Sequence, residues 1–341
     1  MKKIRVALIG LGMAVTPHAK SLVDLSDRLE VTHAFSPSEA RRRAFAQNFA
    51  FPLTARFEDI LEDKSVEAAL VLTPPNTHFE LASRLAAAGK HVLLEKPIEV
   101  NTARAEQLVA AFERAGRSLA LVLQHRFRPG SLRLAQHISA GALGEIAAAT
   151  LSVPWWRPQS YYDEPGRGTL ARDGGGVLMT QAIHTLDLFL SLAGPVARVS
   201  ALGGTSRTHR METEDAVGAG LQFTNGAFGA LWATTAGYPG FAERIELMGT
   251  RATAVLCAGK LDIAWHDGKR EELGEPGAGG GGADPMDFPN DAHRGVLADF
   301  LDAIEQGRAP RASGREALKV HRLIDALLES AKSGRAADVR S

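Results

Sequence analysis

The chain has 341 residues, with 39 Lys and Arg against 39 Asp and Glu, one cysteine and 45% apolar residues. This is the composition of a folded globular protein, and the length predicts about two domains. A net charge of zero excludes the broad electrostatic attraction that nucleic acids and acidic membranes require, so neither is an expected partner. The single Cys257 cannot form an intramolecular disulfide, which is typical of a cytoplasmic protein. No metal site is predicted.

The N-terminus superficially resembles a secretory signal peptide, because Lys2 and Lys3 precede an apolar stretch over 6–15. However, Gly10 and Gly12 interrupt that stretch, and no small-residue cleavage site follows it. No other segment approaches the ~18–20 unbroken apolar residues of a transmembrane helix. We therefore expect a cytoplasmic protein that makes no membrane contact.

Residues 1–123 alternate between short apolar strands and helices. This alternation predicts a Rossmann domain of the α/β class, a doubly wound parallel sheet with right-handed crossovers. The expected strands are 4–9, 30–35, 68–72, 91–94 and 118–123, and the expected helices are 17–25, 38–48, 57–63, 76–88 and 102–115.

From residue 124 to 341 the pattern changes to strands joined without intervening helices, with hairpin-type turns such as Asn225-Gly226 and Asp267-Gly268. This predicts an α+β domain built on a large, mostly antiparallel sheet with flanking helices, and the family resemblance given below implies that this domain serves substrate binding and oligomerisation. The run from Gly274 to Gly282 is expected to be a mobile surface loop without function. The expected strands are 146–153, 196–202, 216–223, 227–233, 244–248, 253–257 and 261–265; the helices are 132–140, 179–192, 296–306 and 315–331, the last two packing back on the body.

A glycine turn follows the first strand and opens a helix, which is where a dinucleotide-binding turn must lie. Gly10 permits the tight turn, and Gly12 lets the backbone approach a pyrophosphate. Met13 and Ala14 complete the turn, so that the helix N-terminus offers its N–H groups to the phosphates. Val15 stands where the pattern requires Gly or Ala, and an ordinary strand-to-helix turn remains the alternative.

The end of the second strand favours NADP over NAD. An NAD site usually places a carboxylate there to bind the ribose 2′-hydroxyl. Here the strand ends at Phe35-Ser36, and Arg41 to Arg43 follow in the next helix. A hydroxyl with a nearby arginine accommodates a 2′-phosphate, so Ser36 and Arg41 are the expected contacts. Alternatively, the arginines form a solvated helix face.

Three further motifs carry chemistry. Thr73-Pro74-Pro75-Asn76-Thr77-His78 and Glu95-Lys96-Pro97 each follow a strand, at the sheet edge where doubly wound folds bind ligands. Thr180 and His184 follow a glycine run, four residues apart on one helix face. Each also has a structural explanation, such as an ion pair for Glu95 or core burial for His184. We expect Thr73, Pro74, Asn76, His78, Glu95 and Lys96 to contact the cofactor.

In this order the motifs resemble the Gfo/Idh/MocA family of NAD(P)-dependent sugar and cyclitol oxidoreductases, over nearly the whole chain. Beyond the motifs above, the resemblance rests on His18, Arg126, Pro129, Gly141, Gly144, Asp187, His293, Phe300, Ala303 and Gly307.

The resemblance implies hydride transfer between the nicotinamide and a carbinol or carbonyl carbon of a sugar-like substrate held between the domains. Lys96 would hydrogen-bond the reacting oxygen, and His184 would take or give its proton. Many members carry Asp as a third site residue where this chain has Thr180, with Gln181 beside it, so Thr180 is the third expected catalytic residue. This difference argues against a cyclitol dehydrogenase. The resemblance also implies a homo-oligomer, a dimer or tetramer, formed through the open face of the second sheet.

An aromatic and basic stretch over 153–163, followed by Arg167-Gly168-Thr169, resembles the subgroup that acts on sugar acids or nucleotide-linked sugars. Aromatic faces stack on sugars or bases, and guanidinium groups bind carboxylates or phosphates. Trp155 and Trp156 could equally be core or interface residues. The expected substrate contacts are Arg126, Trp156, Arg157, Tyr162, Arg167, Thr180 and Gln181.

Two other functions stay open. The family also contains regulators that bind the dinucleotide without turnover, although Lys96 and His184 together favour catalysis. Within the enzymes, the alternative is a reductase of a non-sugar substrate such as a dihydrodiol.

Overall fold

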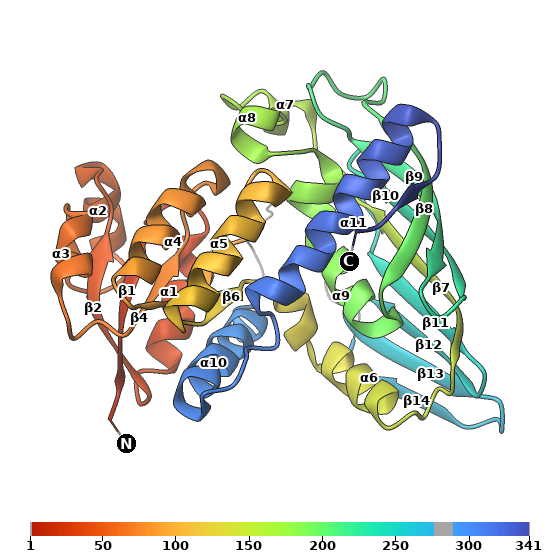
Figure 1. Ribbon diagram of the computed structural model, residues 1–341, viewed down its shortest axis with the longest axis horizontal. Helices are drawn as coiled ribbons and strands as arrows, with labels where there is room; N and C mark the ends of the chain where they lie inside the picture. The colour runs from red at the N-terminus through yellow and green to blue at the C-terminus, as the bar shows by residue number, and fades with distance from the viewer. Residues whose placement is uncertain (1, 276–288, 341) are drawn as a thin grey trace. The chain divides into compact units, whose positions relative to one another are not determined.

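The computed structural model describes residues 2–275 and 289–340, which form two compact units (Figure 1). The first contains residues 2–124 and 289–318, and the second contains residues 125–275 and 319–340. Most of the expected loop from Gly274 to Gly282 lies outside the described residues.

The first unit contains the predicted Rossmann sheet, whose strands are all parallel. Its order is β3-β2-β1-β4-β5-β6. The chain therefore adds β2 and β3 on one side of β1 and then β4, β5 and β6 on the other, so the order of addition switches between β1 and β4. The central strands are fully buried, as their apolar sequences predict. The strands are β1 (Ile4–Ile9), β2 (Leu29–Phe35), β3 (Leu53–Thr54), β4 (Ala68–Val71), β5 (His91–Leu94) and β6 (Leu119–Leu121).

Helices connect these strands, and one helix from near the C-terminus also packs in this unit. Helix α10 (Asp291–Gln306) lies beside α1, where Arg28 binds Asp302 and Glu305 at 2.7 and 2.8 Å. The sequence analysis had grouped this helix with residues 124–341. The other helices are α1 (Val15–Asp24), α2 (Glu39–Ala46), α3 (Phe57–Glu62), η1 (Pro75–Thr77), α4 (His78–Ala87) and α5 (Thr102–Ala115).

The second unit contains the predicted mostly antiparallel sheet, with the order β14-β13-β12-β11-β7-β10-β9-β8-β15. Only the pair β7 and β10 is parallel among its described strands. The strands are β7 (Ile146–Pro154), β8 (Val196–Gly204), β9 (Ala216–Phe223), β10 (Phe228–Thr234), β11 (Arg244–Gly249), β12 (Ala252–Cys257), β13 (Lys260–Trp265), β14 (Arg270–Leu273) and β15 (Ala337–Asp338).

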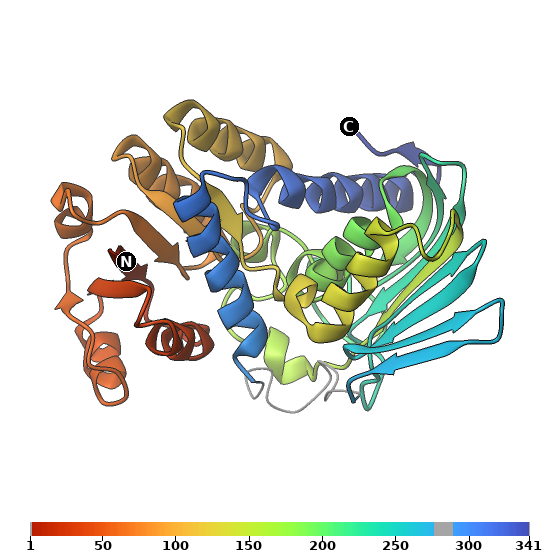
Figure 2. The same ribbon diagram turned by 90° about the horizontal axis from the view of Figure 1, so that it is seen from below.

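The long helices of this unit gather on one face of the sheet (Figure 2). Leu186 and Phe189 of one helix, and Leu323 and Leu327 of another, share one core with the inward-facing strand residues. The helices are η2 (Gln124–Phe127), α6 (Pro129–Ser139), α7 (Gln159–Tyr162), α8 (Leu170–Asp173), η3 (Leu178–Ala182), α9 (Ile183–Ala193) and α11 (Gly314–Ser333), the last beginning in the first unit.

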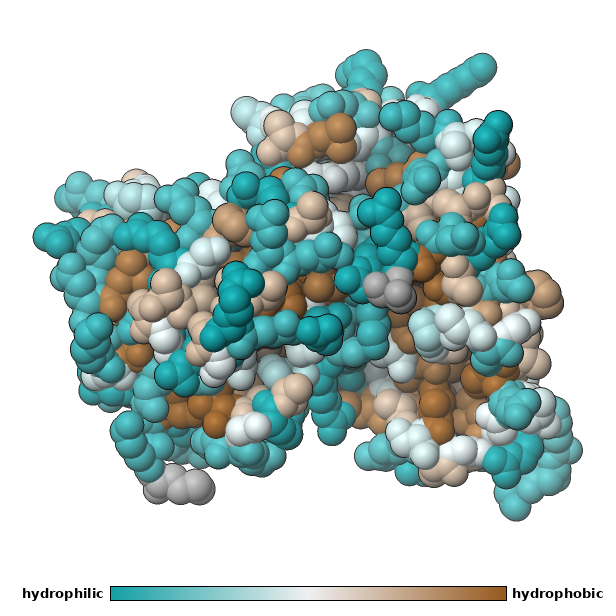
Figure 3. Space-filling model, in the orientation of Figure 1, coloured by the Kyte–Doolittle hydropathy of each residue, from teal (hydrophilic) through white to brown (hydrophobic). Residues whose placement is uncertain are grey.

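The opposite face of the sheet carries exposed apolar side chains. Leu202, Gly218 and Trp232 are register partners across β8, β9 and β10, and Phe228 lies four residues before Trp232 on β10. Leu202 is 77% exposed and Phe228 66%. By contrast, hydrophilic residues cover most of the molecular face drawn in Figure 3, where hydrophobic residues form only small patches.

One stretch of the described chain, Leu170–Ala193, is long and apolar enough to cross a membrane. Its most apolar part is 83% buried inside the protein, as expected for a core helix.

Candidate active site

The glycine turn after β1 leaves part of its backbone open to a ligand. Gly10 has a φ of +100°, and a Cβ there would lie 2.9 Å from the Leu72 carbonyl carbon. A Cβ on Gly12 would meet no atom within 4 Å, so its backbone faces open space. Ala14 provides no side-chain cap for α1, and the Val15 N–H donates to the Gly12 carbonyl at 3.2 Å, so any anion would bind the N–H groups that follow in the first turn. These residues fit a dinucleotide.

Ser36, the expected 2′-phosphate contact, ends β2 in a buried position. Its hydroxyl accepts a hydrogen bond from the Ser38 N–H at 3.3 Å. Arg42, rather than Arg41, reaches it, because Arg42 Nη1 donates to the Ser36 carbonyl at 2.5 Å. Arg41 is exposed, and Arg43 pairs with Glu39 on the solvated face of α2. Arg43 therefore lies on a solvated helix face, and Arg42 lies at the end of β2, whereas a 2′-phosphate contact by any of the three arginines stays a prediction.

His78 connects the two motifs that follow β4 and β5. It is fully buried, with Nε2 2.8 Å from the Thr73 carbonyl oxygen and Nδ1 2.9 Å from that of Pro97. Burial lowers the pKa of His78. Because both nitrogens face the protein's own backbone, His78 positions the loops around Thr73 and Lys96, which could in turn contact a cofactor.

Glu95 lies directly before Lys96 and anchors its backbone. Glu95 Oε2 accepts the Lys96 N–H at 3.0 Å, and Oε1 lies 2.8 Å from His18 Nε2. Burial alone would raise the pKa of Glu95, but the His18 hydrogen bond and the charges of His18, Lys96 and His293 lower it to about 2. The carboxylate is therefore ionised, and it links α1 to the lysine motif.

In the second unit, the helix that carries His184 begins with a π-helical turn, η3, instead of the continuous α-helix expected. Glu214 caps this start by accepting from the N–H groups of Gly176 and Leu178 at 3.0 and 3.2 Å. A Cβ on Gly176 would overlap the Glu214 carbonyl oxygen, which explains the glycine. Such π-turns are frequent at functional sites, and this one contains Thr180.

Two arginines flank the ring of Tyr161 near this helix. The guanidinium carbons of Arg157 and Arg167 lie 5.8 and 4.2 Å from the ring centre, and Arg167 Nη1 donates to the Tyr161 hydroxyl at 2.6 Å. Gln181 Nε2 also donates to that hydroxyl, at 3.4 Å, and Thr180 donates to the Gln181 side chain. The structure thus brings together four predicted substrate residues: Arg157, Arg167, Thr180 and Gln181.

The other aromatic residues of this stretch have different environments. Tyr162 is buried with its hydroxyl 2.7 Å from Thr235 Oγ1, and burial raises its pKa to about 12. Trp155 belongs to the hydrophobic core, which was one of the alternatives to a substrate contact. Trp156 is half-buried, with its ring against Tyr238 and His209. Tyr161, which the sequence analysis did not select, is the aromatic residue between the two guanidinium groups.

Arg126 contacts the helix that carries His184. Its Nε and Nη2 donate to the two carboxylate oxygens of Asp187 at 2.6 and 2.7 Å, and Asp187 is buried. This bidentate pair holds the helix one turn after His184. A substrate contact by Arg126 stays a prediction.

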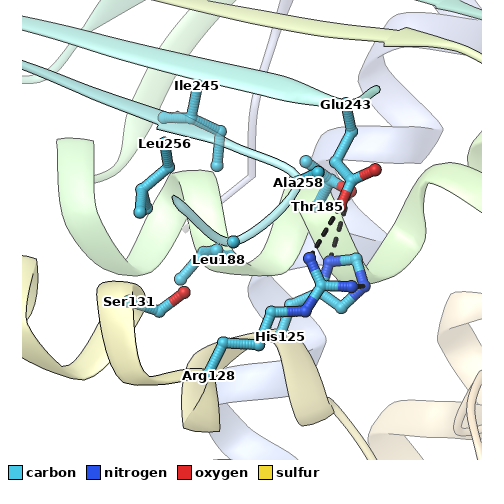
Figure 4. A pocket seen from close by; sticks show the side chains of 10 residues that line it. His125, Arg128, Ser131, Thr185, Leu188, Glu243, Ile245, Leu256 and Ala258 are labelled. Atoms are coloured by element: carbon cyan, nitrogen blue, oxygen red, sulfur yellow. Dashed lines mark hydrogen bonds and ion pairs between the residues drawn. The ribbon is translucent and has the colours of Figure 1, made fainter. Parts of the chain in front are cut away.

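His125, Arg128 and Glu243 form a cluster that the sequence patterns did not predict (Figure 4). The His125 ring centre lies 5.2 Å from that of His184, and Arg128 Nη2 lies 2.7 Å from His125 Nε2. Arg128 Nη1 binds Glu243 at 2.6 Å. The dense basic run from His125 to Arg128 was the available sign, but the sequence did not show that Glu243, over a hundred residues later, meets it.

Two family profiles match the chain. Residues 4–122 match the profile described as "Oxidoreductase family, NAD-binding Rossmann fold", and residues 131–255 match the "GFO/IDH/MocA C-terminal domain".

Known proteins resemble the chain over its length. It is 26% identical to D-apiose dehydrogenase of Paraburkholderia graminis, covering 100% of this chain and 91% of that protein. It is 26% identical to inositol 2-dehydrogenase of Rhizobium meliloti, covering 96% of each. Among solved structures, the WlbA dehydrogenase of Bordetella pertussis in complex with NADH and UDP-GlcNAcA superimposes with a TM-score of 0.84 at 28% identity, covering all of both chains.

Proposed function

The chain belongs to the GFO/IDH/MocA family and is an NAD(P)-dependent dehydrogenase, and we propose that it oxidises a hydroxyl group, or reduces the matching carbonyl, of an anionic sugar-like substrate. The observation that carries the anionic substrate is the pair of guanidinium groups around Tyr161.

The chemistry is divided among a few side chains. A bound nicotinamide dinucleotide accepts or supplies the hydride. The Lys96 ammonium hydrogen-bonds the reacting oxygen and stabilises its negative charge. His184 takes the hydroxyl proton during oxidation and returns it during reduction. Glu95 holds the backbone of Lys96, and Glu214 holds the start of the His184 helix.

The arginine pair supplies recognition of the negative group. Arg157 is buried, and burial together with the nearby charge of Arg167 lowers the pKa of its guanidinium. Arg167 Nε already pairs with Glu164 at 2.6 Å, but the two guanidinium groups together carry more positive charge than this one carboxylate balances. The excess favours a carboxylate or phosphate, which a guanidinium binds through two parallel hydrogen bonds. The WlbA relative, whose complex contains UDP-GlcNAcA, supports a nucleotide-linked sugar acid as the first candidate.

The cofactor we propose is NADP, on the basis of Ser36 and Arg42. Inositol 2-dehydrogenase and WlbA, as relatives, support the sugar-like class of substrate without deciding between the two dinucleotides.

The proposed assembly is a homo-oligomer, a dimer or tetramer, formed by the exposed sheet face around Leu202, Phe228 and Trp232. A second copy of the same flat, apolar face is complementary to it by two-fold symmetry. Light scattering of Leu202→Glu beside Thr208→Glu, an exposed control on the following loop, tests this. An unchanged mass for Leu202→Glu would contradict it. A cytoplasmic location also remains part of the proposal.

The activity is tested by absorbance at 340 nm with NAD⁺ or NADP⁺ and a panel of neutral sugars, inositols, free uronic acids and UDP-linked uronic acids. We expect the highest kcat/KM with an anionic substrate. Arg167→Gln should raise KM for that substrate at least tenfold, as for a lost charged contact. Arg207→Gln, an exposed arginine of the same unit, should leave it unchanged. Equal kcat/KM for neutral sugars would refute the anionic class.

A further inference from the structure

We propose that Arg128 is a positioning residue for proton transfer at His184, because it holds the neighbouring His125 in its neutral form with the proton on Nδ1. The inference rests on the proposed function in one respect, the role of His184 as acid and base.

The first step is the direction of the hydrogen bond between Arg128 and His125. A guanidinium group has only donors, so the nitrogen that it meets at 2.7 Å, His125 Nε2, must act as the acceptor. A histidine that accepts through Nε2 is neutral and carries its proton on Nδ1. Consistently, His125 Nδ1 lies 3.4 Å from Thr185 Oγ1, which can accept that proton.

The second step is that Arg128 is itself held in place. Its Nη1 donates to Glu243 Oε1 at 2.6 Å, and Glu243 is 4% exposed. The Gly259 backbone also lies close to the Arg128 side chain, since a Cβ at Gly259 would lie 3.3 Å from Arg128 Cδ. In Figure 4 the side chains of His125, Arg128 and Glu243 converge at one end of the cavity. Arg128 therefore cannot easily turn away from His125.

The third step is the consequence for His184. The two imidazole rings lie 5.2 Å apart at an angle of 34°, and both residues are buried. When the substrate alcohol is oxidised, the hydrogen on its carbinol carbon leaves as hydride to the oxidised nicotinamide, and the hydroxyl proton goes to His184, which becomes a cation. A second imidazolium at this distance would oppose that charge. His125 cannot take a proton at Nε2 while Arg128 donates there, so the proton stays on His184.

The direct test is the tautomer of His125 in the full-length protein. Nitrogen-15 NMR of ¹⁵N-histidine-labelled protein at pH 7 distinguishes a protonated Nδ1 from a protonated Nε2 and from an imidazolium. His125→Gln assigns the resonances. We expect a neutral ring with the proton on Nδ1. A proton on Nε2, or on both nitrogens, would overturn the proposal.

Variants connect this state to the reaction. Arg128→Met, which has no donor, should change the His125 spectrum and lower kcat about tenfold or more, with KM and dinucleotide affinity within about twofold. Arg128→Lys retains a donor and should therefore restore part of the natural His125 spectrum and part of kcat. Arg133→Met is the matched control, because Arg133 lies five residues after Arg128, inside the helix α6 that Arg128 precedes, and pairs with Glu271 at 2.6 Å. Arg133→Met should change neither the His125 spectrum nor kcat.

The outcomes separate the two proposals. A slower Arg128→Met enzyme with an unchanged His125 spectrum would reduce Arg128 to a structural role and overturn the inference. If Arg128→Met does not fold, the spectrum of the natural protein decides alone. Normal turnover by His184→Ala would refute the proposed function, whereas the His125 spectrum would be unaffected by that result.

Discussion

The imidazole of His18 lies 2.8 Å from the carboxylate of Glu95, and thereby joins the helix after the glycine turn to the residue that precedes Lys96. The other oxygen of the same carboxylate accepts the Lys96 N–H. One largely buried, ionised group therefore couples the proposed phosphate-binding turn to the proposed catalytic lysine.

Glu95→Gln should retain the shape of this connection and remove its charge. We expect kcat to fall about tenfold or more, because the amide binds His18 and the Lys96 backbone more weakly than a carboxylate does. Steady-state kinetics beside Glu62→Gln, an exposed control, measures the effect. Full activity of Glu95→Gln would show that the charge has no catalytic importance.

Lys96→Ala and His184→Ala should each lower kcat by ~10²-fold or more, as is typical for loss of an acid, a base or an oxyanion partner. Dinucleotide affinity, followed by fluorescence, should stay within a few-fold. The controls are Lys64→Ala and His266→Ala, both exposed. If one of the two active-site variants retains normal turnover, the role proposed for that residue is wrong. Absence of turnover with every substrate, despite tight dinucleotide binding, would instead favour a regulator.

Cofactor choice should depend on Ser36 and Arg42. Titration with NADPH and NADH should show tighter binding of NADPH, and Ser36→Asp should reverse the preference, since a carboxylate repels the 2′-phosphate and binds the ribose hydroxyls. Arg42→Ala should weaken NADPH alone, whereas Arg43→Ala, on the solvated face, should not. Tighter binding of NADH by the natural protein would refute this use of Ser36.

The stability of the protein should fall below neutral pH because of His321. This residue of α11 is fully buried, and burial lowers its pKa from 6.5 to about 4. The unfolded chain then binds a proton at a higher pH than the folded chain does. The contribution of neutral His321 to the free energy of unfolding is therefore fully present above pH 6.5. It decreases between pH 6.5 and 4, by up to about 1.4 kcal/mol per pH unit.

Thermal unfolding of the natural protein and His321→Gln from pH 7 to 4 measures this loss. The variant should show a smaller fall in Tm across the window, whatever its Tm at pH 7. Parallel curves for the two proteins would show that another group causes the acid sensitivity. His266→Gln, an exposed control, should follow the natural protein.

Local patterns in the sequence determined most of the fold. The spacing of apolar residues and the glycine turns predicted the two sheets and the phosphate-binding turn. The strand ends and the helix pattern predicted the positions of Lys96 and His184 on their elements. Each of these features depends on residues close together in the chain. The short edge strands β3, β14 and β15 escaped prediction, since two to four residues carry too little pattern.

Contacts between distant segments required the tertiary structure. Glu243 meets Arg128 across 115 residues, Glu214 caps the His184 helix across 38, and α10 returns to lie beside α1. Likewise, the sequence offered Arg41 and Tyr162, whereas folding brought Arg42 to Ser36 and Tyr161 to the arginines. Which neighbour turns inward depends on packing against residues far along the chain, and no local pattern encodes that choice.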